Sequence, residues 1–159
     1  MRFCCKLPLT KNEFESFLKK PRLAHLATSS SKGKPRVTPM WFAYDHGIFY
    51  FTTRLHRVKG QHMKRNPFMA LSIATDEQPY QAVCAFGKVE IVNESRNDWL
   101  KKISFRYGEK EGRAWFESAI KQPDRVVLAL KPERILSWHY GRDDSSRQDE
   151  GESMATTIS

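Results

Sequence analysis

The sequence predicts one domain of mainly β structure, a closed or split antiparallel barrel with helices beside it. The chain has 159 residues, a length typical of a single domain with a sizeable core. Six or seven segments are rich in β-branched and aromatic residues, which favour strands. The connections between them are short and favour antiparallel pairing. Long aromatic strands in a chain of this size favour a barrel with helices covering an opening.

The first half is predicted to be a helix followed by a three-stranded meander. Thr10 and Glu13 have the spacing of a capping box and Pro21 ends the apolar pattern, so a helix is expected at 10–20. Pro39 indicates that its strand is an edge strand or carries a bulge, because proline cannot donate to a strand ladder. The three strands, joined by polar turns, are expected at residues 22–28, 35–45 and 48–53.

The second half is predicted to add three helices and the remaining strands. A basic helix is expected at 56–66. Ser95 and Asp98 have the spacing of cap residues for the next helix, which Gly108 stops, and the last helix ends before Pro123. The remaining strands are expected at residues 68–75, 80–93, 124–131 and 134–140.

The folded domain is expected to leave short polar segments at both ends. We expect an N-terminal extension at 1–9, the domain at 10–141 and a flexible polar tail at 142–159. The first residues lack the pattern of a signal peptide, and no apolar run approaches the ~18 residues that would span a membrane. The expectation is therefore a cytoplasmic protein without a membrane partner.

Cysteine and histidine usage argues against disulfides and metal. The cysteines, Cys4, Cys5 and Cys84, are too few for a disulfide framework. The chain has five scattered histidines and no Cys-x-x-Cys pair. No metal site is therefore expected.

The charge of the chain calls for an anionic partner. Lys and Arg number 27 against 18 Asp and Glu, a formal net charge of +9. Part of the excess lies between Arg54 and Arg65, where a predicted strand runs into a predicted helix. Such a junction offers free backbone N–H groups and a positive helix end to a phosphate. The pattern predicts a phosphate cradle, with a solvated basic helix face as the alternative. Its members would be Thr52, Thr53, Arg57 and Lys59.

The strand around Pro39 is a candidate wall for a flat aromatic ligand. Alternation places Arg36, Thr38 and Met40 on one face and Pro39 and Trp41 on the other. One face would line a pocket with apolar groups and polar anchors, and plain core packing is the alternative. The chain shows no nucleophile–base–acid arrangement and no Gly-x-Gly-x-x-Gly or Walker loop. Catalytic residues stay unassigned, and enzymatic chemistry would come from a cofactor.

Several segments in order resemble one known family. They are AHLAT, P-x-x-x-P-M-W-F, FYFTT followed by R-V-K-x-x-x-M-K-R-N-P, and QPY before a long strand. Together they resemble the pyridoxamine 5′-phosphate oxidase-like proteins of the flavin-binding split-barrel superfamily, in particular the deazaflavin-dependent ones. The likeness covers about residues 10–140. It implies a six- to seven-stranded split β-barrel of the FMN-binding type, an oxidoreductase using FMN or coenzyme F-420 on a small organic substrate, and a homodimer with cofactor sites at the subunit interface.

The resemblance also assigns site residues. The cofactor phosphate would meet Thr52, Thr53, Arg57 and Lys59. The ring would lie against the strand from Arg36 to Trp41, through backbone groups and Thr38, Pro39 and Met40. The partner subunit would contribute Gln78, Tyr80 and Trp138. Basic residues at the pocket mouth would favour coenzyme F-420, which has a longer acidic tail than FMN; the candidates are Arg54, Lys64 and Arg65.

Two other functions remain open. A non-catalytic carrier of FMN or coenzyme F-420 would need the same phosphate cradle. A basic nucleic-acid-binding barrel would explain the charge, but such proteins interleave basic and stacking residues along a strand face. Here the basic residues gather on one predicted helix, so nucleic acid is the less favoured partner.

Overall fold

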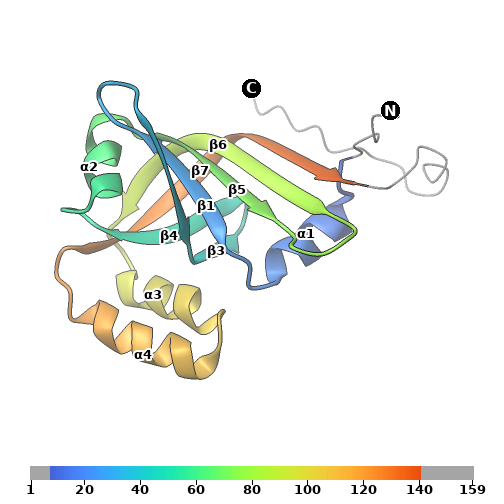
Figure 1. Ribbon diagram of the computed structural model, residues 1–159. Coiled ribbons are helices and arrows are strands. Elements are labelled where there is room, and N and C mark those ends of the chain that lie inside the picture. Colours follow the sequence, from blue (N-terminus) through green and yellow to red (C-terminus); the bar gives the residue numbers. More distant parts are fainter. Residues whose placement is uncertain (1–7, 141–159) are drawn as a thin grey trace.

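The computed structural model describes residues 8–140, which form one curled antiparallel sheet with four helices (Figure 1). This confirms the predicted mainly β split barrel. The strands are β1 (Ala24–Ser29), β2 (Pro35–Met40), β3 (Phe42–Asp45), β4 (Ile48–Arg54), β5 (Phe68–Ala74), β6 (Gln81–Val92) and β7 (Arg125–His139). The helices are α1 (Lys11–Lys19), α2 (Val58–Arg65), α3 (Arg96–Phe105) and α4 (Glu109–Ile120). Cys4, Cys5 and the predicted tail at 142–159 lie outside the described residues.

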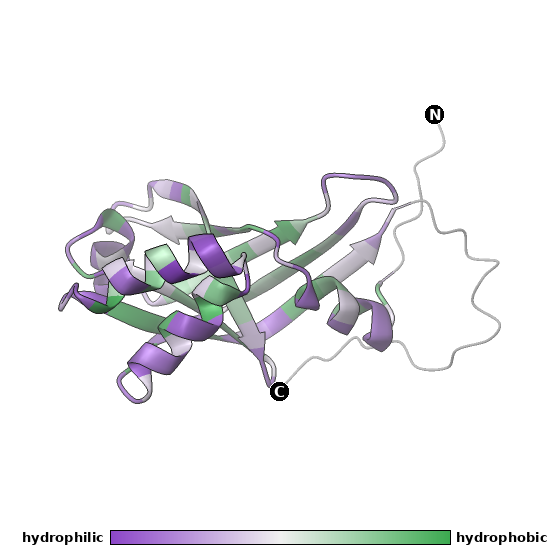
Figure 2. Cartoon of the chain, turned by 90° about the horizontal axis from the view of Figure 1, so that it is seen from below, coloured by the Kyte–Doolittle hydropathy of each residue, from purple (hydrophilic) through white to green (hydrophobic). Residues whose placement is uncertain are grey.

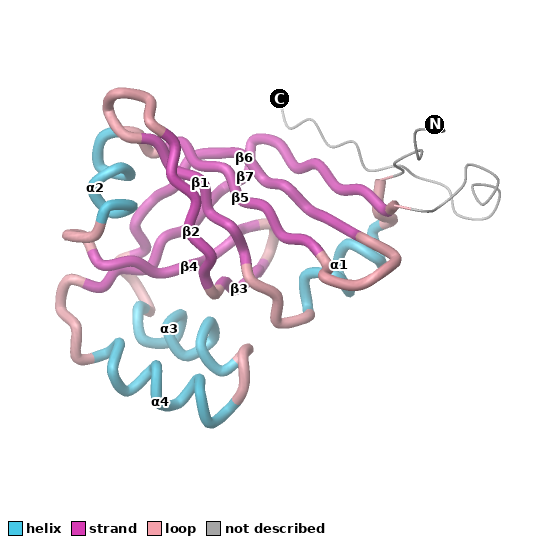
Figure 3. The backbone as a smooth tube through the Cα atoms, in the orientation of Figure 1, coloured by secondary structure: helices cyan, strands magenta, loops and turns pink. Residues whose placement is uncertain are grey.

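The two edges of the sheet are joined by a single residue. The strand order is β2-β1-β5-β6-β7-β4-β3, so β2 and β3 are the edges, and only Trp41 separates them in the chain. The sheet must therefore curl until its edges meet (Figure 3). The continuous strand predicted at 35–45 is thus wrong, whereas the edge position predicted from Pro39 is confirmed.

Tyr107, just beyond α3, secures the point where the strand breaks. The backbone N–H of Phe42 donates to the Tyr107 hydroxyl at 3.0 Å, and that hydroxyl donates to the carbonyl of Arg22 at 2.6 Å. The Tyr107 ring stacks on Trp41 with centroids 4.8 Å apart. We call this junction of β2 and β3, held by Trp41 and Tyr107, the seam.

Strand β7 replaces two predicted strands. It runs through Pro132 without a break because the pairing with β6 shifts between Phe86 and Gly87. A Cβ on Gly87 would lie 2.1 Å from the carbonyl oxygen of Lys131, so the two backbones can approach this closely only at a glycine. The separate strands predicted at 124–131 and 134–140 are therefore one bulged strand.

The helix starts were predicted with mixed success. At α1 the capping box is present, because Glu13 N–H donates to Thr10 Oγ1 at 3.3 Å and Thr10 N–H donates to Glu13 Oε2 at 2.8 Å. At α3, Ser95 is the N-cap residue as predicted, but it has φ 51° and its side chain makes no cap hydrogen bond, so the predicted side-chain capping is wrong.

The main core fills the inside of the curled sheet, with Phe17 and Leu18 of α1 entering it. A smaller core, with Leu100 of α3 and Ala119 of α4, holds the α3–α4 hairpin against Val127 of β7. Apolar residues are concentrated in the strands, whereas polar residues make up much of the helices (Figure 2). Within residues 8–140 no helix is long and apolar enough to cross a membrane, and no cluster of metal-ligating side chains occurs.

Candidate cofactor site

A cavity of about 460 Å³ opens where β2, β4, α2 and the start of β7 meet. We call it the cationic compartment. No Asp or Glu is among the residues that line it, so its charge is strongly positive. The lining residues are Arg36, Thr38, Thr52, Thr53, Arg54, Arg57, Val58, Lys59, Gln122 and Arg125.

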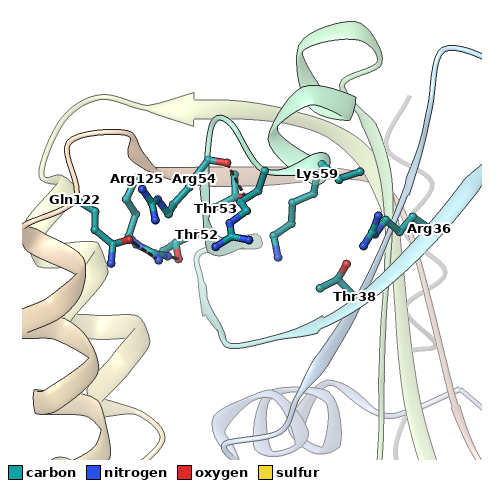
Figure 4. Close-up of a pocket in the computed structure, with 10 residues that line it drawn as sticks. Arg36, Thr38, Thr52, Thr53, Arg54, Lys59, Gln122 and Arg125 are labelled. Carbon is teal, nitrogen blue, oxygen red and sulfur yellow. Dashed lines mark hydrogen bonds between the residues drawn. The ribbon is translucent and has the colours of Figure 1, made fainter.

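Seven of the predicted residues meet in this compartment, including Arg54, a candidate for the pocket mouth. The four cradle residues come from the end of β4 and the start of α2, and Arg36 and Thr38 come from β2. In Figure 4 the Lys59 side chain extends from α2 into the space between Thr38 on one side and Thr52 and Thr53 on the other. The basic segment therefore lines a cavity, rather than only forming a solvated helix face.

The surroundings of Lys59 disfavour its positive charge. Burial lowers the pKa of Lys59, and the nearby charges of Arg125, Arg36 and Arg57 lower it further. An anion placed among these groups would replace the lost water and relieve the repulsion between them. The electrostatics of the compartment are thus those of an anion-binding site.

The start of α2 adds neutral donors to the same place. Arg57 is the N-cap residue and gives no side-chain cap, and the first turn contains no acidic residue. The first N–H groups of a helix lack partners within the helix and point to where an anion would lie. A Cβ on Gly60 would lie 2.7 Å from the carbonyl oxygen of Leu55, so glycine allows α2 to start this close to the end of β4.

Asp124 fixes the junction of β4 and α2 from the side. Its carboxylate accepts from Arg54 Nε at 3.0 and 3.2 Å and also contacts Nδ1 of His56. Its carbonyl accepts from the N–H of Leu55 at 3.0 Å. Burial alone would raise the pKa of Asp124, but the hydrogen bonds from His56 and Arg54 lower it. Arg54 is therefore neutralised within the protein, while the other cations of the compartment are not.

A second cavity of about 330 Å³ continues from the first, and we call it the aromatic compartment. The two cavities share Thr52, Lys59 and Arg125. Trp41 and Trp115 face it with ring centroids 5.8 Å apart. The predicted ring-binding residues Pro39, Met40 and Trp41 all lie here, at the seam. The full lining is Leu23, Pro39, Met40, Trp41, Thr52, Lys59, Ile103, Trp115 and Arg125.

Sequence reasoning missed Arg125 and Gln122. Arg125 Nη1 donates to Thr52 Oγ1 at 2.9 Å, and Arg125 Nε and Nη2 donate to Gln122 Oε1 at 3.0 and 2.9 Å. Only the pairing of β7 with β4 brings these residues to Thr52, and no local pattern around them signals a site.

Five other predicted residues lie outside both compartments. Lys64 and Arg65 of α2 do not line either cavity. Gln78, Tyr80 and Trp138 lie at the opposite end of the sheet, around the β5–β6 turn and the end of β7. Within one chain they cannot share a ligand with Thr52, so their predicted role depends on a partner subunit.

The two compartments together suit a ligand with a phosphate at one end and a flat ring at the other. The sequence profile described as pyridoxamine 5′-phosphate oxidase matches residues 10–139, which span both compartments and the whole sheet.

The chain belongs to the pyridoxamine 5′-phosphate oxidase family.

The solved structures that this chain is similar to differ in what their names report. An F420 reductase is 33% identical, with 76% of this chain and 94% of that chain covered and a TM-score of 0.64. A FAD-binding protein from Mesorhizobium loti is 18% identical over 88% and 100% of the two chains, with a TM-score of 0.66. The heme storage protein from Vibrio cholerae is 17% identical over 82% and 96%, with a TM-score of 0.66. No curated protein matches the sequence.

Proposed function

We propose that this protein binds a phosphorylated tricyclic redox cofactor, FMN or coenzyme F-420, and acts as an oxidoreductase on a small organic substrate. The observation that carries the proposal is the continuity of the two compartments. Cations, threonine hydroxyls and a helix start surround one end, and two tryptophans, Pro39 and Met40 surround the other. The residues therefore fit the group.

The number of cations favours coenzyme F-420 over FMN. Arg36, Arg57, Lys59 and Arg125 line the cationic compartment, and no hydrogen bond or ion pair between any of them and a carboxylate occurs within residues 8–140. One phosphate monoester carries at most two negative charges, so positive charge remains for a further acidic group. Arg36, rather than Lys64 and Arg65, would take the role predicted for the pocket mouth. The 33% identity to an F420 reductase supports the same choice.

The protein would contribute binding, orientation and exclusion of water. When bound, the tricyclic ring supplies the hydride chemistry, for which the described residues offer no side-chain substitute. Arg57, Lys59 and the start of α2 would hold the phosphate. Trp41 and Trp115 would confine the ring, which fixes the face open to a substrate.

Equilibrium titration with each cofactor tests the proposal. We expect micromolar or tighter binding of coenzyme F-420 and weaker binding of FMN, followed by absorbance and fluorescence. Arg57→Gln should weaken binding about tenfold or more, because it removes a charge-assisted contact. Lys64→Gln is the matched control: it removes the same charge from the same helix but lies outside both compartments, and should have little effect. Failure of the wild-type protein to bind either cofactor would refute the proposal.

Turnover separates an enzyme from a carrier, because both need the same cradle. The enzyme proposal predicts oxidation of the reduced cofactor by an organic acceptor, measured under anaerobic conditions. A protein that binds the cofactor but never exchanges electrons with any acceptor would instead be the carrier considered above.

We also propose a homodimer in which each partner completes the other's site. Arg125 and Trp138 stand 13 positions apart on β7, which corresponds to roughly 40 Å along an extended strand. That length exceeds the length of FMN. Trp138, Gln78 and Tyr80 would thus wall a cofactor only if they belonged to the other subunit.

A further inference from the structure

Arg125 is a cation whose position in the site is fixed by neutral groups. It lines both compartments. Its guanidinium donates to the Thr52 hydroxyl and, through two nitrogens, to the side-chain oxygen of Gln122. Neither partner carries a charge. These contacts therefore fix the orientation of the guanidinium without cancelling its positive charge.

Trp115 places the same group at the edge of the aromatic compartment. The centre of the Arg125 guanidinium lies 4.9 Å from the centroid of the Trp115 ring. A cation over an aromatic face is attracted more strongly as water is removed. Burial, followed by the charge of Arg54, lowers the pKa of Arg125, and only Asp124 acts in the opposite sense. Arg125 is thus a partly desolvated charge for which a negative charge in the aromatic compartment would be a suitable partner.

A redox ring bound in that compartment would become one unit more negative if it took up a hydride, which is one proton and two electrons, without a second proton. A cation fixed in place before the reaction stabilises such a charge without the cost of reorganisation. The phosphate at the other end of the cofactor keeps its charge throughout.

We propose that Arg125 is an electrostatic residue for the ring, which stabilises the reduced form of the cofactor relative to the oxidised form. The inference rests on the proposed function. It differs from a role in the phosphate cradle, because a phosphate ligand contributes equally to both redox forms. Arg57 serves as the comparison, since it lines the cationic compartment and not the aromatic one.

The experiment measures dissociation constants of both redox forms under anaerobic conditions. The probe is FMN reduced with dithionite, or coenzyme F-420 reduced with borohydride, whichever the wild-type protein binds. For Arg125→Gln we expect the reduced form to bind at least tenfold more weakly and the oxidised form to change less than threefold. A tenfold change in the ratio corresponds to about 30 mV in the potential of a two-electron couple. Arg57→Gln should weaken both forms by the same factor.

Further variants test whether the charge itself matters. Arg125→Lys keeps the charge and should keep most of the preference for the reduced form. If Arg125→Gln does not fold, as judged by thermal melting, Gln122→Leu removes two of the three hydrogen bonds that the Arg125 guanidinium donates and should reduce the preference to an intermediate value.

The outcomes separate the inference from the proposed function. If Arg125→Gln weakens both forms equally, or neither, or if the lysine variant loses the preference as fully as glutamine, the inference is refuted while cofactor binding stands. If the wild-type protein binds neither form, both the proposed function and the inference fail.

Discussion

Lys59 is the residue on which the pH dependence of ligand binding should rest. Its ammonium group is partly buried and lies near three arginines that line the same compartment. Because the pKa of Lys59 is lowered, it loses its proton at a less alkaline pH than an ordinary lysine. Anion binding favours the charged form and should raise that pKa again.

We therefore expect the affinity for the phosphorylated cofactor to fall as the pH rises through the lowered pKa of Lys59. Lys59→Arg should remove most of this fall, because a guanidinium stays protonated over the whole range. The measurement is the dissociation constant from about pH 7 to 10 for both proteins. The same cofactor in both series cancels its own titration, and superimposable curves would contradict the assignment.

The cradle was accessible to sequence reasoning because its residues are neighbours in the chain. Thr52, Thr53, Arg57 and Lys59 fall within one strand-to-helix junction, so local spacing brings them together. Arg125 lies more than 60 residues further on, and only the register of β4 against β7 places it beside Thr52. No propensity or spacing rule reports such a register, so Arg125 could not be predicted.

At the scale of elements, Asp124 connects the start of β7 to the junction of β4 and α2. It neutralises Arg54 and receives the backbone N–H of Leu55. Removing this carboxylate would make the site more positive, which by charge alone would tighten anion binding. The geometry predicts the reverse, because loss of the carboxylate contacts to Arg54 and His56 loosens the junction that positions the start of α2, although the backbone bond from Leu55 remains.

We expect Asp124→Asn to weaken cofactor binding three- to tenfold, measured by equilibrium titration at constant ionic strength. Glu117→Gln is the control, since it removes the same charge from the exposed face of α4 and should leave binding unchanged. Unchanged or tighter binding by Asp124→Asn would show that its charge matters more than its contacts.

The two errors in predicting strands have a common origin. Residues 35–45 were predicted as one strand because polar and apolar residues alternate in both halves. The two edges of the curled sheet nevertheless meet inside that segment. Pro132 read as a strand break, yet a bulge opposite Gly87 accommodates it. Both features depend on strands distant in the sequence, whereas the capping box of α1 is local and was predicted.

At the scale of the whole molecule, one face of the sheet is left with apolar side chains exposed. Val37, Phe68, Phe86 and Leu136 are 60%, 54%, 40% and 38% exposed. Val37 and Phe86 belong to one cross-strand row through Ala27 and Ala70, so they lie on the same face. An exposed apolar patch of this kind is a candidate for the subunit interface of the proposed homodimer.

We expect light scattering to give twice the 18.5 kDa mass of one chain for the wild-type protein. Phe86→Glu should shift this equilibrium toward the monomer and weaken cofactor binding together, although Phe86 lines neither compartment. Ile120→Glu is the matched control, because Ile120 is similarly exposed at 38% but lies on α4. Loss of the dimer with full cofactor affinity would mean that each chain holds its cofactor alone.

The seam has a consequence for how the ring could be recognised. Because β2 and β3 are the two edges of the sheet, each leaves one side of its backbone without a neighbouring strand, and on β3 the N–H of Phe42 already donates to Tyr107. A planar heterocycle with its own N–H and carbonyl groups could form hydrogen bonds there with main-chain N–H and carbonyl groups. Recognition of this type is independent of side-chain identity. Relatives on this fold could therefore change most residues of the aromatic compartment and still accept the same ring, while an inserted residue at Trp41 would abolish the match.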